Sequence, residues 1–367
     1  EESFPLAVNV CKICFHCQLT HIVNPDILFK NYLYVSGTTK TYLGYMEWFA
    51  EYCLDNYKQY SGYTPKHINH VILDIGCNDG SQLDAFAKQG CITYGIDPAE
   101  NLFNVSKSKH NILLGYFDKN YPIHPKMDII TAQNVFAHNQ NPLQFLKDCE
   151  RILLPGGLIF IQTSQANMIQ NNEFDTVYHE HISFFNTLSM KVLCEQAGLY
   201  LIDVIKTPIH GTSYVFVISK HQYKRTAVEN QINMEKSEGL FNLETYIEYG
   251  QNSLIQNVDN IKEMVEENRK KGFLIVGYGA PAKGNTFLNY SKIHVDFIVD
   301  DNKMKQGLFT PGSSIEIKDP SVIKDIPYDQ KVLFIPLAWN FFDEIQKRIR
   351  TFRNNDKDIF LHLDNPK

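Results

Sequence analysis

The stretch Leu73-Asp74-Ile75-Gly76-Cys77-Asn78-Asp79-Gly80 decides the fold of this chain. It ends an apolar run that begins at His70, and a segment with helical character follows it from Ser81. Glycine lets a backbone turn tightly and approach a ligand without a side chain in the way. The stretch therefore predicts a strand, a ligand-binding loop and a helix in succession. The residues that we expect beside the ligand are Asp74, Gly76, Asn78 and Gly80.

A second acidic position narrows the kind of ligand. The next predicted strand, Gly90–Asp97, ends about 20 residues further on in a carboxylate that can accept the hydroxyls of an adenosine ribose. A dinucleotide site would place a third glycine at the start of the helix to seat a pyrophosphate. Asp79 would repel a pyrophosphate but would tolerate a sulfonium and an ammonium group. We therefore assign Asp97, Pro98 and Asn134, which follows a later predicted strand, to a cationic adenosine cofactor.

Strand-like and helix-like segments alternate along two regions of the chain. The alternation over residues 66–220 predicts a parallel sheet covered by helices on both faces. A second alternation over residues 271–367 predicts a smaller α/β unit. Residues 221–270 are polar and charged with helical spacing, and we expect a helical connector there. Residues 1–65 are expected to form a short irregular module with a cysteine cluster and many aromatic residues.

Length, charge and cysteine content restrict the classes to which the chain can belong. Its 367 residues are enough for two or three domains. A net charge of -6 argues against a non-specific nucleic-acid binder, which would carry a basic face. No apolar run is long enough for a membrane span. Eight cysteines without the pattern of a secreted scaffold indicate reduced thiols in the cytoplasm. We expect a monomer or a weak homodimer with no nucleic-acid or membrane partner.

Several motifs resemble one enzyme family, in order along essentially the whole chain. The cofactor loop resembles that of class I S-adenosylmethionine-dependent methyltransferases. The segment Phe174–Phe185, with Tyr178-His179-Glu180-His181, resembles the hallmark of C-methyltransferases that act on nucleotide-linked (dTDP) 4-keto-deoxysugars. The resemblance implies a Rossmann-like methyltransferase domain, a second smaller α/β domain that binds the nucleotide sugar, and an N-terminal zinc module. Further segments that resemble this family are Tyr32–Gly37, Gly277–Thr286, Lys305–Gly307 and Thr310–Gly312.

The resemblance implies methyl transfer to the carbon next to a ketone, at C-3 of the 4-keto sugar. Such a carbon becomes nucleophilic when a base removes its proton while the enolate oxygen is stabilised. Histidine suits the base because its pKa lies near neutral pH, and the match to the family motif assigns this role to His181. We expect Glu180 to orient His181 or to hold a sugar hydroxyl, and His138 to face the same cleft because it follows a predicted strand. The other residues expected at the sugar or its enolate are Tyr178, His179, Tyr34 and Tyr32.

A glycine-rich loop in the C-terminal region, Gly277–Asn285, follows a predicted strand and leads into a helix. The amides of a helix N-terminus bind anions, and Lys283 adds positive charge. We therefore expect the diphosphate of a nucleotide-diphosphate sugar at Gly279, Lys283, Gly284 and Asn285. The alternative interpretation is a tight turn with a solvated lysine.

Two departures from the family pattern affect the expected ligands. The family opens with two Cys-x-x-Cys pairs that bind zinc, whereas only Cys11-Lys12-Ile13-Cys14 is present here. A closed structural zinc site needs four ligands, so we expect an incomplete site in a chain whose first pair would precede residue 1. Thr212 and Val215 stand where the family usually has a glycine and an arginine, which leaves the exact substrate open.

Three other functions are compatible with parts of the sequence. An O- or N-methyltransferase acting on a sugar or another small molecule would need no acidic C–H bond and would not exchange its proton. Two glycine-rich α/β units are also typical of an NAD(P)-dependent oxidoreductase, but Asn78, Asp79 and the missing third glycine oppose this function. A non-catalytic binding protein could keep the fold, but the cluster His179-Glu180-His181 is typical of an active site.

Overall fold

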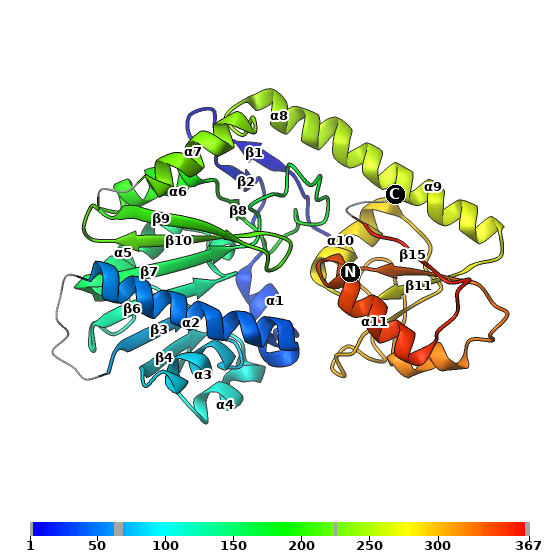
Figure 1. Cartoon of the computed structure of the whole chain (residues 1–367), viewed down its shortest axis with the longest axis horizontal. Helices are drawn as coiled ribbons and strands as arrows, with labels where there is room; N and C mark the ends of the chain where they lie inside the picture. The colour runs from blue at the N-terminus through cyan, green and yellow to red at the C-terminus, as the bar shows by residue number, and fades with distance from the viewer. Residues whose placement is uncertain (1–2, 62–68, 224–225, 364–367) are drawn as a thin grey trace. The chain divides into compact units, whose positions relative to one another are not determined.

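The chain forms two compact units in this computed structural model, which describes residues 3–61, 69–223 and 226–363 (Figure 1). We refer to them as the larger unit and the C-terminal unit. The larger unit comprises Leu6–Asn167 and His179–Leu243. The C-terminal unit comprises Glu1–Pro5, Met168–Tyr178 and Glu244–Lys367.

A seven-stranded sheet forms the centre of the larger unit, in the order β5-β4-β3-β6-β7-β10-β9. Neighbouring strands from β5 to β7 are parallel, whereas β10 is antiparallel to both β7 and β9. The predicted parallel sheet is thus confirmed from β5 to β7, whereas β9 and β10 add an antiparallel pair at its edge. The reason is that only residues 208–212 connect β9 to β10, too few for a parallel crossover. The strands are β3 Val71–Ile75, β4 Ile92–Asp97, β5 Asn111–Leu114, β6 Met127–Gln133, β7 Leu153–Thr163, β9 Tyr200–Thr207 and β10 Ser213–Ser219.

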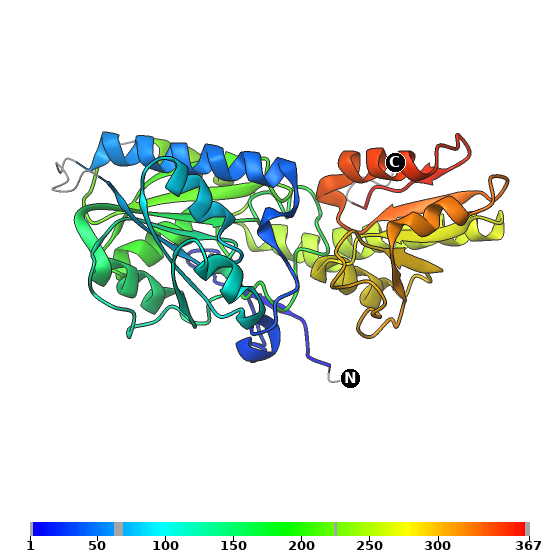
Figure 2. The same ribbon diagram turned by 90° about the horizontal axis from the view of Figure 1, so that it is seen from below.

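Helices cover both faces of this sheet, as the predicted α/β fold requires. Ile72 of β3 belongs to a buried cluster that includes residues of α2 and α3. Its neighbour Leu73 belongs to a separate cluster that includes residues of α5, α6 and α7, because successive side chains of a strand point to opposite faces. Figure 2 shows α2 lying along one face of the sheet. The helices are α2 Lys40–Tyr60, α3 Ser81–Lys88, α4 Glu100–Lys107, α5 Pro142–Ile152, α6 Thr187–Gln196 and α7 Ala227–Ser237.

The N-terminal region contains more regular structure than the sequence interpretation expected. Strands β1 (Val8–Val10), β2 (Cys17–Leu19) and β8 (Ser183–Phe184) form a small antiparallel sheet. A short helix, α1 (Pro25–Phe29), follows β2, and the 21-residue helix α2 begins at Lys40. The apolar side chains that α2 buries recur with a helical period, and they include Tyr42, Met46, Phe49, Cys53 and Tyr57.

The C-terminal unit is a second α/β fold with a five-stranded parallel sheet, in the order β13-β12-β11-β14-β15. The expected connector over residues 221–270 is divided between the units, since α7 packs in the larger unit and α9 packs against the core of this one. The elements are β11 Leu274–Tyr278, β12 Phe297–Val299, β13 Ile317–Lys318, β14 Val332–Pro336, β15 Ile359–Phe360, α8 Leu243–Glu248, α9 Leu254–Lys270, α10 Ala282–Ser291 and α11 Phe342–Phe352. No helix within the three described ranges is both long and apolar enough to span a bilayer.

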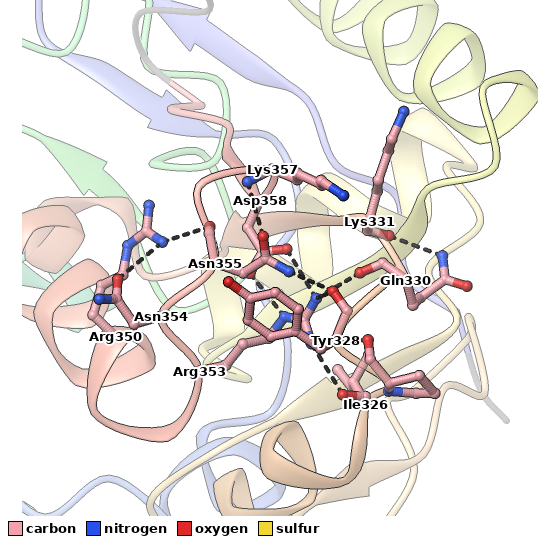
Figure 3. Close-up of polar contacts among 11 residues, drawn as sticks. Ile326, Tyr328, Gln330, Lys331, Arg350, Arg353, Asn354, Asn355, Lys357 and Asp358 are labelled. Carbon is pink, nitrogen blue, oxygen red and sulfur yellow. Dashed lines mark hydrogen bonds and ion pairs between the residues drawn. The ribbon is translucent and has the colours of Figure 1, made fainter.

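A buried ion pair lies just after α11, and its arginine also fastens the loop before β14 (Figure 3). Arg353 donates from Nε to Asp358 Oδ2 at 2.8 Å, and their side chains are 4% and 0% exposed. The remaining guanidinium donors reach backbone carbonyls of the loop that precedes β14, at Ile326, Pro327, Tyr328 and Gln330. A buried charge is tolerated when its hydrogen bonds are satisfied in this way.

Candidate active site

The predicted loop between β3 and α3 has the backbone that a close ligand approach requires. Gly76 and Gly80 adopt φ angles of +74° and +85°, and Asn78 adopts +50°. These values lie in the left-handed region that favours glycine and asparagine. A Cβ atom on Gly76 would also collide with the side chain of Val135. The two glycines are therefore required by geometry, and α3 begins at Ser81 as predicted.

Asp97 lies at the end of β4 and holds the turn around the loop. Its Oδ2 accepts a hydrogen bond from the Asn78 backbone N–H at 2.8 Å, and its Oδ1 accepts one from the Ala99 backbone N–H at 2.8 Å. Burial raises the pKa of Asp97 above its ordinary value. A carboxylate offers about four acceptor sites, so Asp97 keeps acceptor capacity for a ribose hydroxyl. Pro98 links it to Ala99 at the same strand end.

The side chains of Asn78 and Asp79 hold the segment Tyr34–Gly37 against the cofactor loop. Asn78 donates from Nδ2 to the Tyr34 carbonyl at 3.0 Å and accepts from the Ser36 N–H at 3.0 Å. Asp79 accepts from the Gly37 N–H at 3.0 Å. A Cβ atom on Gly37 would collide with Ser81 and Asp79. The sequence interpretation missed this bracing role, because the two partners lie 42 positions apart.

Asp74 is a buried acid within β3, behind the loop. It accepts a hydrogen bond from the Thr131 hydroxyl at 2.6 Å. Burial raises the pKa of Asp74 to about 7. Its predicted neighbour in the site, Asn134, follows β6 with a φ of +53° and donates its backbone N–H to the Gln162 carbonyl. Both residues therefore lie at or near the carboxyl end of the sheet, where open α/β folds bind ligands.

His138 and His181 face each other in the larger unit. Their ring centroids are 5.3 Å apart with an interplanar angle of 30°, and Phe29 stacks on His138 with a centroid distance of 5.5 Å. Burial lowers the pKa of His138 well below its ordinary value, and His181 lowers it further. His138 is therefore neutral at neutral pH. Its Nε2 is buried and has no hydrogen-bond partner among the described residues.

Contacts connect this histidine pair to the cofactor loop. Glu180, beside His181, accepts a hydrogen bond from the Tyr32 hydroxyl at 2.9 Å. The Tyr32 ring lies 6.4 Å from that of Tyr34, whose carbonyl is bound by Asn78. Asn101 holds the Tyr32 backbone with two hydrogen bonds, of 3.1 and 2.9 Å. The structure thus brings together His138, His181, Glu180, Tyr32, Tyr34 and the cofactor loop.

The other predicted residues are Tyr178, His179 and four residues of the C-terminal unit. Tyr178 belongs to the C-terminal unit, whereas His179 belongs to the larger unit. In the C-terminal unit, Gly279 adopts a φ of +85° before α10, and the Lys283 ammonium lies 4.1 Å from the centroid of the Trp339 ring. A Cβ atom on Gly284 would lie 2.9 Å from the Leu337 side chain, so helix packing requires this glycine. Asn285 Oδ1 is buried without a partner among the described residues.

Cys11 and Cys14 lie in a turn between β1 and β2. The Ile13 N–H approaches Cys11 Sγ at 3.5 Å. Hydrogen bonds from the Cys14 and Ile13 amides lower the pKa of Cys11, which favours the thiolate that binds metals. Within the described ranges, no group of three or more His, Cys, Asp or Glu side chains is arranged to hold a metal ion.

Sequence reasoning missed a set of buried polar side chains at the ends of β6 and β7. Gln133 Oε1, Thr163 Oγ1 and both amide atoms of Gln165 are buried without partners in the described part of the chain. Buried polar atoms in proteins are otherwise almost always hydrogen-bonded. A polar run directly after an apolar strand, Gln162-Thr163-Ser164-Gln165, was the available signal. These atoms are candidates for contacts with a polar ligand.

Comparison with known families assigns both halves of the chain. Residues 42–204 match a methyltransferase domain, and residues 208–363 match a C-methyltransferase C-terminal domain. The chain is an S-adenosylmethionine-dependent C-methyltransferase. The expected C-methyltransferase family and the expected fold class are thereby confirmed, and both matched families are methyltransferase families rather than oxidoreductases.

Known proteins resemble this C-methyltransferase to different extents. The C-methyltransferase NovU of Streptomyces niveus is 29% identical over 100% of this chain and 88% of its own length. A ubiquinone biosynthesis O-methyltransferase of Coxiella burnetii is 27% identical over 41% of this chain and 71% of its own length. The structure of magnesium protoporphyrin IX methyltransferase of Synechocystis with bound S-adenosylmethionine has a TM-score of 0.38 and 11% identity, and the match covers 52% of this chain and 88% of that one.

Proposed function

We propose that this enzyme methylates a carbon adjacent to the ketone of a nucleotide-linked keto-deoxysugar, at C-3 of a 4-keto sugar, through a base-generated enolate. The observation that carries the proposal is the pair His138–His181 beside Glu180, connected by Tyr32 and Tyr34 to the cofactor loop. An O- or N-methyltransferase would need only to deprotonate a heteroatom. A C-methyltransferase must form a carbanion equivalent, and this requires both a base and a donor for the developing oxyanion.

The residues present have complementary roles in this chemistry. His181, which is buried, removes the proton from the sugar carbon. Neutral His138 can donate a hydrogen bond from its unpartnered Nε2 to the enolate oxygen that forms next to that carbon. Glu180, held by the Tyr32 hydroxyl, orients His181 and stabilises its protonated form.

The cofactor loop fits S-adenosylmethionine. Gly76 and Gly80 leave the backbone open to the ligand, and Asp97 keeps acceptor capacity for the ribose. When bound, the cofactor supplies an electrophilic methyl group that needs no covalent enzyme intermediate. The protein's contribution is then to align carbon, methyl and sulfur.

The C-terminal unit is proposed to bind the nucleotide diphosphate. The proposal is supported by the positive φ of Gly279 just before α10 and by Lys283 in the first turn of that helix, whose backbone amides could bind an anion. Such a site would hold the substrate through a part that does not react. Binding energy from that part can then be used to orient the sugar for methyl transfer.

Hydrogen exchange tests the proposed base. The enzyme with S-adenosylhomocysteine is incubated in D₂O with a panel of nucleotide 4-keto-sugars, and deuterium at the sugar carbon is measured. Wild type should exchange that proton, whereas His181→Ala should exchange it about 10²- to 10⁴-fold more slowly. His294→Ala, at an exposed histidine of the C-terminal unit, is the matched control and should behave as wild type.

Two outcomes would contradict this assignment. If wild type transfers labelled methyl groups to an oxygen or a nitrogen and exchanges no C–H proton, the substrate class is wrong. If His181→Ala exchanges as fast as wild type, the base lies elsewhere, and Tyr34, His138 and His179 become the candidates in that order.

We also propose that Cys11 and Cys14 bind zinc in an incomplete site. The Cys-x-x-Cys spacing supports metal binding, but two thiolates are fewer than a closed structural site needs. Elemental analysis of this chain should therefore find less than one equivalent of zinc. A full equivalent bound by these residues would contradict the proposal.

All eight cysteines are free, which supports a reducing, cytoplasmic location.

A further inference from the structure

Three polar side chains at the ends of β6 and β7 have hydrogen-bonding capacity that the protein itself does not use. Thr163 is 0% exposed and Gln165 is 5% exposed, and Gln133 is partly buried. Thr163 Oγ1, both amide atoms of Gln165 and Gln133 Oε1 lack a hydrogen-bond partner within the described ranges. A buried polar group without a partner destabilises a protein by more than a typical hydrogen bond stabilises it. Several such groups close together therefore indicate a ligand.

The three residues lie at the carboxyl end of the sheet of the larger unit. Gln133 is the last residue of β6 and is in register with Gln162 of β7. Thr163 is the next residue and the last one of β7, and Gln165 follows two positions later. Open α/β sheets bind their ligands at this end of the strands. The position of these groups is therefore that of a binding site.

These residues lie on the side of the cofactor loop away from Asp97, the expected ribose contact. Asp97 ends β4, and the sheet order places β3 and β6 between β4 and β7. Neighbouring strands lie about 4.8 Å apart, so Thr163 lies roughly 14 Å from Asp97 across the sheet. His138 lies in the turn just after β6, the strand next to β7. The unpartnered groups are thus on the side of the cofactor loop on which His138 lies.

The backbone around Gln165 is held in place, although this residue lies beyond the strand. The ladder between β7 and β10 extends to the pair Thr163 and Tyr214. Beyond Gln165, the Ala166 N–H donates to the Thr212 carbonyl at 3.1 Å. Binding groups that are already positioned cost less entropy when a ligand orders them. Thr163 and Gln165 are therefore positioned before a ligand binds.

The chemistry of these groups fits a neutral ligand with hydroxyl groups. Hydroxyl and amide side chains both donate and accept hydrogen bonds, as the hydroxyl groups of a sugar do. Gln133 Nε2 already donates to Gln82 Oε1 at 2.9 Å, so Gln133 presents its carbonyl oxygen, which only accepts. A diphosphate also offers only acceptors and would be repelled there. The set therefore favours the sugar ring over the charged part of a nucleotide sugar.

We propose that Thr163, Gln165 and Gln133 bind hydroxyl groups of the acceptor's sugar ring and so determine which sugars the enzyme accepts. This inference rests on the proposed function, which gives the acceptor as a nucleotide-linked keto-sugar. The hydroxyl groups that these residues bind do not react. The three residues are therefore specificity-determining rather than catalytic.

The test uses Thr163→Val, which replaces the hydroxyl by a methyl group and keeps the shape of the side chain. We expect the KM for a nucleotide 4-keto-sugar that wild type methylates to rise about 3- to 10-fold, the contribution of one hydrogen bond. The melting temperature of the ligand-free enzyme should rise by about 2–4 °C, because a buried hydroxyl without a partner is removed. The affinity for S-adenosylmethionine, measured by calorimetry, should not change.

Thr187→Val is the matched control. Thr187 is also a threonine of the larger unit with 0% exposure, but its hydroxyl donates to the buried Glu235 carboxylate. Thr187→Val should therefore lower the melting temperature and leave the KM for the sugar unchanged. Gln165→Met removes the amide and keeps the length of the side chain, and it should act as Thr163→Val does. This variant decides the question if Thr163→Val does not fold.

Three results would overturn the inference. If Thr163→Val and Gln165→Met lower the melting temperature and leave the KM unchanged, these groups stabilise the fold and bind no sugar. If they weaken S-adenosylmethionine binding and leave the KM for the sugar unchanged, they belong to the cofactor site. Both results leave the proposed function intact, because wild type methylates the sugar in each. If wild type methylates no keto-sugar, the proposed function fails and the inference fails with it.

Discussion

Substitution of Arg353 tests whether the buried ion pair of the C-terminal unit is a principal source of its stability. Arg353→Met leaves the Asp358 carboxylate, whose side chain is 0% exposed, without its cation. It also removes the donors that reach the backbone carbonyls of Ile326, Pro327 and Gln330. Removing one partner of a buried pair costs about 3–5 kcal/mol. We therefore expect the free energy of unfolding of this unit to fall by roughly 4 kcal/mol.

Urea unfolding followed by tryptophan fluorescence measures this effect. In a Trp48→Phe background the only tryptophan is Trp339, which lies in the C-terminal unit. With a slope of about 2 kcal/mol per molar urea, the unfolding midpoint should fall by roughly 2 M. Arg348→Met is the matched control, because the side chains of Arg348 and its partner Asp301 are 49% and 52% exposed and such pairs contribute about 0–1 kcal/mol.

A double substitution separates the two parts of the loss. Arg353→Met combined with Asp358→Leu removes the unpaired charge but leaves the loop carbonyls without donors. It should recover part of the stability and not all of it, since an unsatisfied buried carbonyl costs about 1–3 kcal/mol. If Arg353→Met costs no more than Arg348→Met, the reasoning about this pair is refuted.

Two further predictions concern the cofactor site. Asp97→Ala removes the acceptor of the Asn78 and Ala99 amides and the proposed ribose contact, so calorimetry should show that S-adenosylmethionine binds about 10- to 100-fold more weakly. Asp118→Ala, at an exposed aspartate, is the control and should bind the cofactor as wild type does. Equal affinities of Asp97→Ala and wild type would exclude Asp97 from the site. Burial raises the pKa of Asp74 to about 7 in the folded state, so ionisation of Asp74 disfavours that state. The stability that the protonated form contributes is therefore lost as pH rises from about 4, the ordinary pKa of an aspartate, through 7. Asp74→Asn should therefore gain stability relative to wild type between pH 5 and pH 8, by up to about 3 kcal/mol in urea unfolding without ligand, and a difference that does not vary with pH would contradict this.

The cofactor loop was predictable because its determinants are local. Glycines at positions 76 and 80 adopt positive φ angles, and the flanking strand and helix begin and end close to where the apolar pattern changes. The helical spacing of the buried side chains of α2, from Tyr42 to Tyr57, was also present in the sequence. The interpretation of that region as irregular overlooked it because the cysteines and aromatic residues were read as a small module.

The contacts that hold the site residues in place could not be predicted in the same way. Asn78 and Asp79 were interpreted by their charge toward a ligand, but their side chains bind the backbone of residues 34–37. Membership of Met168–Tyr178 in the C-terminal unit depends on bonds such as Asp175–Trp339 between distant positions. One sequence contains no signal for such pairings, so the roles of the site residues remain predictions that rest on motif and proximity.

The membership of Met168–Tyr178 in the C-terminal unit has a consequence for protein synthesis and engineering. This segment leaves the ribosome before any residue from Glu244 onward, yet its partners Tyr249, Tyr290 and Trp339 all lie in that later part. The C-terminal unit can therefore complete its core only after the rest of the chain has been made. A fragment that ends at Leu243 would expose Phe174 and leave Asp175 without its indole donor. Transfer of the C-terminal unit between relatives would thus require two grafts, the C-terminal region and this segment, made together.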